Sequence, residues 1–274
     1  MTSKPKKLYP SSSAFMWGRI VFTDYGSGCL RSILAKSRGV RTGEIDECHK
    51  IRGAFNEEEY KKRLERDKIP YLDETKVVEQ IGDTGVIFSG RVDIRVDPDN
   101  TGEFPVPEEL KSTESKSKKS AVISGGKYGL NQMAQLVAYM VALRSTIGRL
   151  IFTYYDRAKD GTYSRPPDKM YAGRLLKSER IFEVEVDERG TLVIDNKPSQ
   201  WTVDDQLLWR QTAAEVINSG EVWERPFNYD SNYGSPCKFC EFSQTCQKWD
   251  DGILNTTEEF VRSAQTEANE KGAK

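Results

Sequence analysis

Hydrophobic and polar residues alternate most clearly between residues 86 and 96, where the apolar set is Val92, Ile94 and Val96. An alternation of two residues is the period of a half-buried strand. Residues 98–102 (PDNTG) then predict a turn. A second strand is expected over 108–112, since Pro105 and Pro107 come just before it, where proline is tolerated. The two strands therefore form a candidate antiparallel pair.

Helical patterns surround this pair. The strongest is 130–144, whose surface is apolar nearly all round, which implies burial. The other predicted elements are helices at 27–38, 56–68 and 203–219, a strand at 151–155 and a hairpin at 180–196. Thr202 and Asp205 are spaced as a capping box for the last of these helices, and Gly220 marks its end.

This order of elements predicts a single α/β domain without an obvious linker. We expect an N-terminal segment at 1–24, a main domain at 25–251, and a polar tail or frayed helix at 252–274. The 41 basic and 42 acidic residues give a net charge of −1, so any attraction to nucleic acid must be local. Met133–Leu143 is too short to span a membrane and no secretory signal is visible, so we expect a cytoplasmic protein, in the host cytoplasm if it is viral.

Five cysteines are the first candidate chemistry. Three lie close together in a C-x2-C-x5-C pattern, namely Cys237, Cys240 and Cys246. A tetrahedral metal or an iron–sulfur cluster needs four thiolates, and Cys29 is the natural fourth. Zinc and a cluster both fit this set, and inert buried thiols are the weaker alternative. Cys48 reads as a small core residue.

Acidic residues on the two predicted strands are the second candidate. Glu109 and Lys111 are two apart and therefore project from one face, while Leu110 turns into the core. If the strands pair, Asp93 joins them. Two carboxylates and an ammonium suit phosphodiester hydrolysis with Mg²⁺ or Mn²⁺. Taken alone, the pattern is more typical of a surface salt bridge on a sheet.

The region after these strands adds weight to a nuclease. Asn131, Gln135 and Tyr139 form one polar line on an otherwise apolar helix, either as a hydrogen-bonded network or for use in a site. The segment between Lys111 and Leu130 holds five lysines against one acid, a local charge of +4. Such a segment can contact a nucleic-acid backbone or can be a solvated loop. His49, the single histidine, is either incidental or a ligand that favours Mn²⁺.

In order, these motifs resemble those of RecB-type PD-(D/E)XK nucleases that bear a [4Fe–4S] cluster. The likeness extends to the CRISPR-associated iron–sulfur exonucleases and to the nuclease domains of AddB and of a eukaryotic helicase-nuclease. It covers about residues 25–250 and rests on Cys29-x-Arg31, His49, Gly90-x-x-Asp93, Glu109-x-Lys111, Gln135-x-x-x-Tyr139 and Cys237-x2-Cys240-x5-Cys246. No GxxxxGK[ST] run is present, so the chain does not resemble the helicase half of such enzymes.

The resemblance implies a restriction-endonuclease-like mixed sheet flanked by helices, and a metal-dependent DNA exonuclease. It implies that the catalytic ion is held by Asp93, Glu109, His49 and the carbonyl of Leu110, with Lys111 as the catalytic lysine. Gln135 and Tyr139 would lie near the scissile phosphate. The four cysteines would hold the cluster and join the two ends of the domain. A CRISPR-adaptation complex or a helicase is the implied partner. The alternative is a non-cleaving DNA-binding or scaffold subunit that the cluster stabilises.

Overall fold

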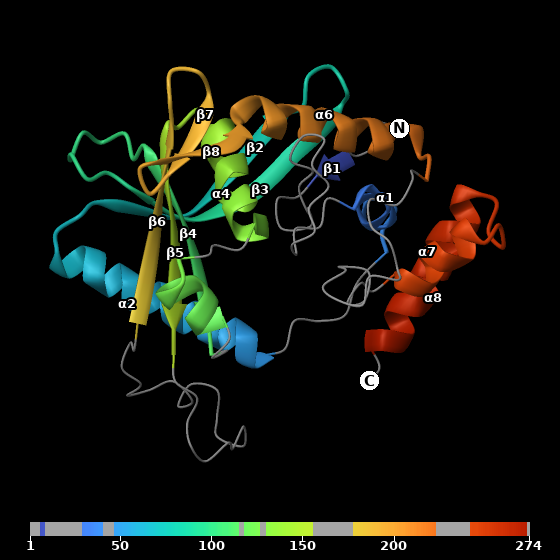
Figure 1. Cartoon of the computed structure of the whole chain (residues 1–274), viewed down its shortest axis with the longest axis horizontal. Coiled ribbons are helices and arrows are strands. Elements are labelled where there is room, and N and C mark those ends of the chain that lie inside the picture. Colours follow the sequence, from blue (N-terminus) through green and yellow to red (C-terminus); the bar gives the residue numbers. More distant parts are fainter. Residues whose placement is uncertain are drawn as a thin grey trace, which may run out of the picture. The chain divides into compact units, whose positions relative to one another are not determined.

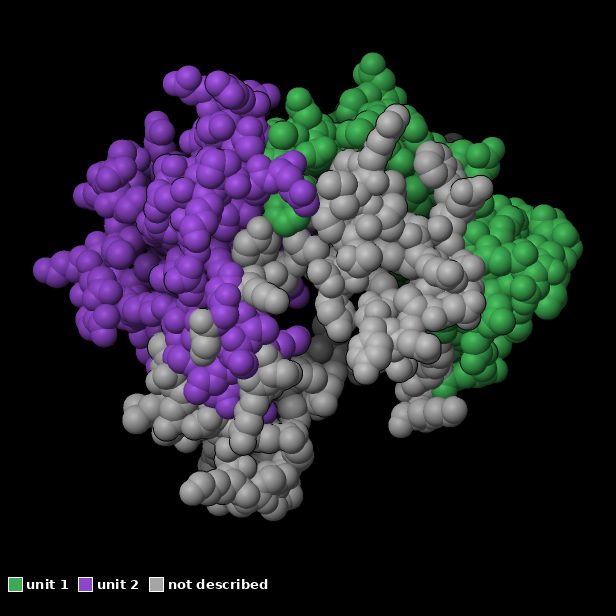
Figure 2. All heavy atoms as spheres, in the orientation of Figure 1, with its two compact units in different colours: residues 1–44, 77–90, 201–274 green, residues 45–76, 91–200 purple. Residues whose placement is uncertain are grey.

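The computed structural model describes the following parts of the chain: residues 6–8, 29–40, 47–114, 118–126, 130–155, 178–222 and 242–272 (Figure 1). Contacts divide the chain into two compact units (Figure 2). Unit 1 contains residues 1–44, 77–90 and 201–274, and unit 2 contains residues 45–76 and 91–200. None of the helices in the described part has a stretch long and apolar enough to cross a bilayer.

Unit 2 is a mixed sheet with a helix on each face. Its helical segments are α2 (Glu47–Arg66), the π-helix η2 (Lys119–Ser124) and α4 (Leu130–Leu143). Its strands are β4 (Val106–Thr113), β5 (Ile147–Tyr154), β6 (Ser178–Val186), β7 (Thr191–Ile194), most of β8 (Lys197–Thr202), and parts of β2 (Tyr71–Gln80) and β3 (Val86–Val96).

The strand directions follow from the connections. β4 pairs antiparallel with β3 and parallel with β5, and β5 pairs antiparallel with β6. A parallel pair needs a long crossover, and η2 and α4 provide it between β4 and β5. Fold-class predictions from the sequence are confirmed at this level, because unit 2 is a mixed α/β structure with helices on its sheet.

The two faces of this sheet are covered by different helices. On one face Tyr60 and Leu64 of α2 pack into a core with Ile94, Val96, Val106, Leu110 and Ile151, and Figure 1 shows α2 lying across β4, β5 and β6. On the other face α4 approaches β5 so closely that a Cβ on Gly148 would lie 2.7 Å from the sulfur of Met140. Leu110 therefore points toward α2, whereas its neighbours Glu109 and Lys111 point toward the face of α4.

Within its described residues, unit 1 contains β1 (Lys6–Leu8), which pairs parallel with the first residues of β3, and four helices. These are α1 (Leu30–Ser37), α6 (Val203–Ser219), α7 (Ser243–Asp250) and α8 (Thr257–Gly272). The predicted cap of α6 is confirmed, since Thr202 and Asp205 form a capping box and Gly220 ends the helix at φ 72°. A core joins α1, α7 and α8 through Ala35, Val40, Phe242, Cys246, Phe260, Ala264 and Ala268.

Two sequence expectations are corrected. The charged helix predicted at 56–68 begins earlier, at Glu47, and runs to Arg66. The segment expected as a polar tail or a frayed helix forms the packed helix α8, whose Phe260, Ala264 and Ala268 are buried at helical spacing in the unit 1 core. Burial of one narrow stripe stabilises a helix whose other positions are charged. The domain boundaries expected near residues 25 and 251 stay predictions.

Candidate active site

Asp93 and Glu109 lie beside each other on paired strands of unit 2. The antiparallel register places Ile94 opposite Glu108, so one further step places Asp93 opposite Glu109 on the same side of the sheet. The backbone N–H of Leu110 donates to Oδ2 of Asp93 at 2.8 Å. This bond fixes the Asp93 carboxylate next to the peptide that carries Glu109.

Lys111 completes the group that the sequence singled out. Its Nζ forms an ion pair with Oε1 of Glu109. The Glu109 side chain is fully buried, while 29% of the Lys111 side chain remains exposed. The second carboxylate oxygen of Glu109, Oε2, is buried and has no hydrogen-bond partner among the residues that the structure describes. A buried carboxylate oxygen without a donor is costly unless a ligand satisfies it.

The electrostatics of this group show a shortage of positive charge. Burial raises the pKa of Glu109 to about 8; Lys111 opposes this shift, and the charges of Asp93 and Glu57 add to it. Burial also raises the pKa of Asp93, against the opposing effects of Lys111 and the Leu110 amide. Burial alone would lower the pKa of Lys111, but the charges of Glu109 and Asp93 outweigh it and raise that pKa. The site therefore holds an ammonium ion and favours an added cation.

The carboxylate oxygens of this group supply some, but not all, of the ligands that a divalent cation needs. Mg²⁺ and Mn²⁺ take carboxylate and carbonyl oxygens, and the partnerless Glu109 Oε2 and the adjacent Asp93 carboxylate supply two such donors. No set of three acidic, His or Cys side chains arranged to hold a metal is found within the described residues. His49 lies in the first turn of α2, but its side chain is outside the described part, and so is that of Asn131.

The polar line of α4 is anchored close to the acids. Tyr139 is buried and its hydroxyl donates to the carbonyl oxygen of Arg91 at 2.7 Å, while Nε2 of Gln135 lies 3.5 Å from that hydroxyl. Burial raises the pKa of Tyr139 to about 12, and the charge of Glu109 contributes. Tyr139 therefore stays a neutral donor that holds β3 two residues before Asp93.

Glu57 is a residue that the sequence reasoning missed. Burial raises its pKa, and the negative charge of Asp93 is the next largest cause. No local signal in the sequence distinguishes Glu57 from the other acidic residues of this helix.

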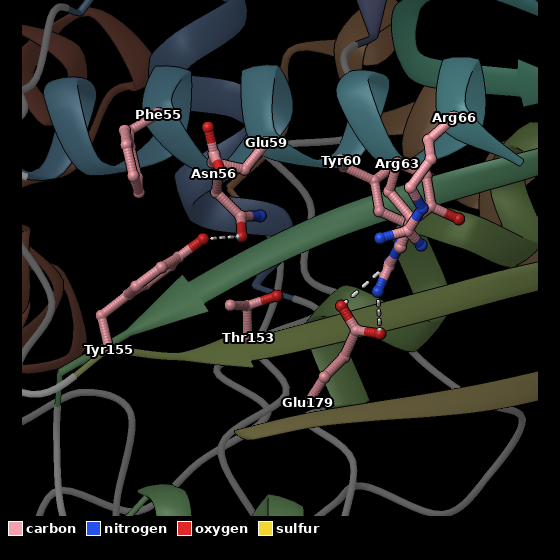
Figure 3. Close-up of a pocket in the computed structure, with 9 residues that line it drawn as sticks. All are labelled: Phe55, Asn56, Glu59, Tyr60, Arg63, Arg66, Thr153, Tyr155 and Glu179. Carbon is pink, nitrogen blue, oxygen red and sulfur yellow. Dashed lines mark hydrogen bonds and ion pairs between the residues drawn. The ribbon is translucent and has the colours of Figure 1, made fainter. Parts of the chain in front are cut away.

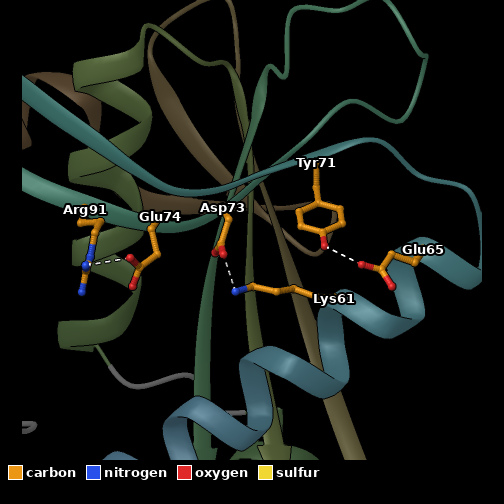
Figure 4. Close-up of polar contacts among 6 residues, drawn as sticks. All are labelled: Lys61, Glu65, Tyr71, Asp73, Glu74 and Arg91. Carbon is orange, nitrogen blue, oxygen red and sulfur yellow. Dashed lines mark hydrogen bonds and ion pairs between the residues drawn. The ribbon is translucent and has the colours of Figure 1, made fainter.

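Ion pairs and a hydrogen bond on the outside of unit 2 hold α2 and β2 in place (Figure 4). Lys61 pairs with Asp73 at 2.5 Å, and the Tyr71 hydroxyl donates to Glu65 at 2.9 Å. Arg91 pairs with Glu74 at 2.9 Å while its carbonyl accepts the Tyr139 bond. These contacts join α2 to β2, and β2 to the strand that carries Asp93.

Cys29 and Cys246 fall in unit 1. Cys29 is the N-cap residue of α1, and Cys246 is buried in α7. Arg31 connects these helices, since its guanidinium donates to the carbonyl of Cys246 at 3.4 Å and pairs with Asp250 at 2.7 Å. Two of the four predicted thiolates thus come from helices that pack together. Cys237 and Cys240 lie outside the described residues, as does the side chain of Cys48.

A buried acid pair with an adjacent lysine, on strands of a mixed sheet between helices, is an arrangement that suits phosphodiester hydrolysis. The family model of the PD-(D/E)XK nuclease superfamily matches residues 25–247. The chain therefore belongs to the PD-(D/E)XK nuclease superfamily.

Solved structures were compared as well. A phage-related exonuclease from Haemophilus somnus 129PT is 12% identical with a TM-score of 0.45, over 69% of this chain and 78% of that one. An alkaline exonuclease from Laribacter hongkongensis is 15% identical with a TM-score of 0.43, over 78% of this chain and 91% of that one. No curated protein matches the sequence significantly.

Proposed function

We propose that the protein is a metal-dependent DNA exonuclease. The observation that carries this is the meeting of Asp93, Glu109 and Lys111 on one side of the β3–β4 pair, with a buried Glu109 oxygen that lacks a donor among the described residues. A binding module has no use for a buried carboxylate pair of this kind, which costs stability. Membership in the nuclease superfamily supports the same reaction.

In this proposal Asp93 and Glu109 hold a Mg²⁺ or Mn²⁺ ion, with the carbonyl of Leu110 and the His49 imidazole as further ligands. The ion would polarise the phosphate and lower the pKa of a bound water. Lys111 remains an ammonium because of its acidic neighbours, so it offsets negative charge that develops on the phosphate. Tyr139 and Gln135 position the strand that bears Asp93 and offer hydrogen bonds near the DNA backbone.

Lysine substitution tests this proposal. Lys111→Ala should reduce cleavage of labelled single-stranded DNA with Mn²⁺ by at least about 10²-fold, since one electrostatic donor contributes that much. Binding of the same DNA should persist, because the lysine-rich segment that includes Lys118 and Lys119 is unchanged. Lys197→Ala, at an exposed position of β8, is the matched control. A metal chelator should stop DNA cleavage by the wild-type protein.

Other outcomes have clear meanings. Loss of DNA binding together with cleavage in Lys111→Ala would contradict the assigned role. A wild type that binds DNA but never cleaves it with either metal would indicate the non-cleaving subunit instead.

We also propose that Cys29, Cys237, Cys240 and Cys246 bind a structural [4Fe–4S] cluster. Support comes from the packing of α1 against the helix that carries Cys246, with Arg31 linking the two. The cluster would join the ends of a nuclease domain that spans residues 25–251. Protein purified without oxygen should be coloured and contain iron, whereas a colourless sample with stoichiometric zinc would favour the zinc alternative.

The sequence motifs support a place among the RecB-type enzymes, near AddB and the CRISPR-associated exonucleases. Processing of free DNA ends in the cytoplasm, during recombination, repair or CRISPR adaptation, follows from that likeness. A helicase or an adaptation complex is the proposed partner.

A further inference from the structure

A cavity lies in unit 2, on the face of the sheet that α2 covers (Figure 3). It has a volume of about 190 Å³ and lies between α2, the end of β5 and the start of β6. The catalytic group faces the other helix, α4, so this cavity is separate from it. Its lining residues are Phe55, Asn56, Glu59, Tyr60, Arg63, Arg66, Thr153, Tyr155 and Glu179.

The middle of the cavity offers unused hydrogen-bonding groups. Asn56 and Thr153 are buried, with 5% and 2% of their surfaces exposed, and in Figure 3 they extend from α2 and β5 on opposite sides. Oδ1 of Asn56 accepts a bond of 2.9 Å from the Tyr155 hydroxyl. No partner for the amide nitrogen of Asn56 or the hydroxyl of Thr153 is found within the described residues. Both groups remain available to a ligand.

Planar side-chain groups form the two ends of the cavity. At one end the rings of Phe55 and Tyr155 meet edge to face at 5.7 Å. At the other end the guanidinium of Arg63 lies 4.5 Å from the centre of the Tyr60 ring and binds Glu179 through two contacts of 2.7 and 3.0 Å. Aromatic rings and guanidinium planes are the surfaces on which nucleobases stack.

The volume of the cavity and its charged side chains limit further which ligands can fit. A dry cavity of about 150 Å³ holds one benzene ring, and drug-sized ligands need about 300 Å³ or more, so this cavity fits one small ring system. Its two acidic and two basic side chains balance, which favours an uncharged ring inside. Arg66 is highly exposed, and its surface pair with Asp67 is of the weak kind that a phosphate can displace.

We propose that this cavity binds a single nucleobase, with the attached phosphate near Arg66. The base comes either from a free deoxynucleoside monophosphate or from an unpaired residue of a DNA strand. Thr153 and the Asn56 amide hydrogen-bond its edge, and the flat ends contact its ring.

The test is equilibrium titration of the full chain in metal-free buffer with chelator, where no cleavage occurs. The probes are the four deoxynucleoside monophosphates, a short single-stranded oligonucleotide, and deoxyribose 5-phosphate as the probe without a base. Thr153→Val removes the hydroxyl with little change in shape and should weaken binding about five- to tenfold. Phe55→Ala, which removes part of one end wall, should also weaken it. Thr191→Val, on β7 away from the cavity, is the matched control.

Each result is decisive for proteins whose thermal unfolding is unchanged. Weaker monophosphate binding in Thr153→Val identifies a free nucleotide as the ligand, and weaker oligonucleotide binding alone identifies a base of the DNA. Equal affinity of wild type and Thr153→Val for every probe, or equal affinity of the wild type for deoxyribose 5-phosphate and the nucleotides, would overturn the proposal. Failure of the nuclease proposal is a separate result, seen only in cleavage assays with metal.

Discussion

Replacing Glu109 with glutamine is expected to stabilise the metal-free protein at neutral and alkaline pH. Glu109 is fully buried, and its carboxylate has one cationic partner, Lys111, and two acidic neighbours, Asp93 and Glu57. Glutamine has nearly the same shape and cannot ionise. It therefore mimics the protonated form of Glu109 at every pH.

The magnitude follows from the pKa of Glu109, about 8 in the folded protein against 4.5 as its ordinary value. The unfolded chain releases this proton first, so the stability of the wild type falls as pH rises from about 4.5 to about 8. At about 1.4 kcal/mol for each pH unit, the loss is about 3 kcal/mol at pH 7 and about 5 kcal/mol above pH 8. The raised pKa of Asp93 acts in the same direction.

Urea unfolding with chelator at pH 5, 7 and 9 measures this. The difference between Glu109→Gln and wild type should be small at pH 5 and should grow with pH, whereas Glu103→Gln, in an exposed turn, should show no such growth. Mg²⁺ at 100 times its Kd should stabilise the wild type by about 2.7 kcal/mol, and Glu109→Gln by less. A variant that is destabilised equally at all three pH values would refute the reasoning.

Further substitutions test the other contacts. Tyr139→Phe removes the bond to the Arg91 carbonyl and should lower the free energy of unfolding in urea by about 1–3 kcal/mol. If Tyr139 also contacts DNA, cleavage should fall further than this loss of stability explains. Unchanged cleavage would make the role of Tyr139 structural. Arg31→Met removes the buried guanidinium and its ion pair with Asp250 and should cost about 3–5 kcal/mol. A loss below about 1 kcal/mol would show that the pair does not join α1 to α7. Phe260→Ala should cost about 3–5 kcal/mol if α8 is part of the core, and a change near zero in thermal or urea unfolding would return α8 to the status of a tail.

Local patterns in the sequence were sufficient for the strands and helices around the site. The alternation of Val92, Ile94 and Val96 identifies β3, and its pairing with the next strand along the chain brings Asp93 to Glu109. Short connections make such neighbours predictable, because consecutive elements usually lie side by side.

The parts that were missed depend on long-range packing. Glu57 was hidden because its effect on Asp93 depends on how α2 lies on the sheet, which the charge pattern of the helix does not specify. Phe260, Ala264 and Ala268 repeat every four residues, but the intervening charged residues make the segment polar on average. This narrow apolar stripe becomes buried only because α1 and α7 pack against it.

The arrangement of unit 1 along the chain has a consequence for synthesis. Arg31 and its partner Asp250 are separated by 219 residues, which a ribosome takes about 10–40 s to add at ~5–20 residues per second. During that time the apolar side of α1 lacks the helices that later cover it. The nascent chain therefore exposes this apolar, aggregation-prone side until nearly all of the chain has been synthesised.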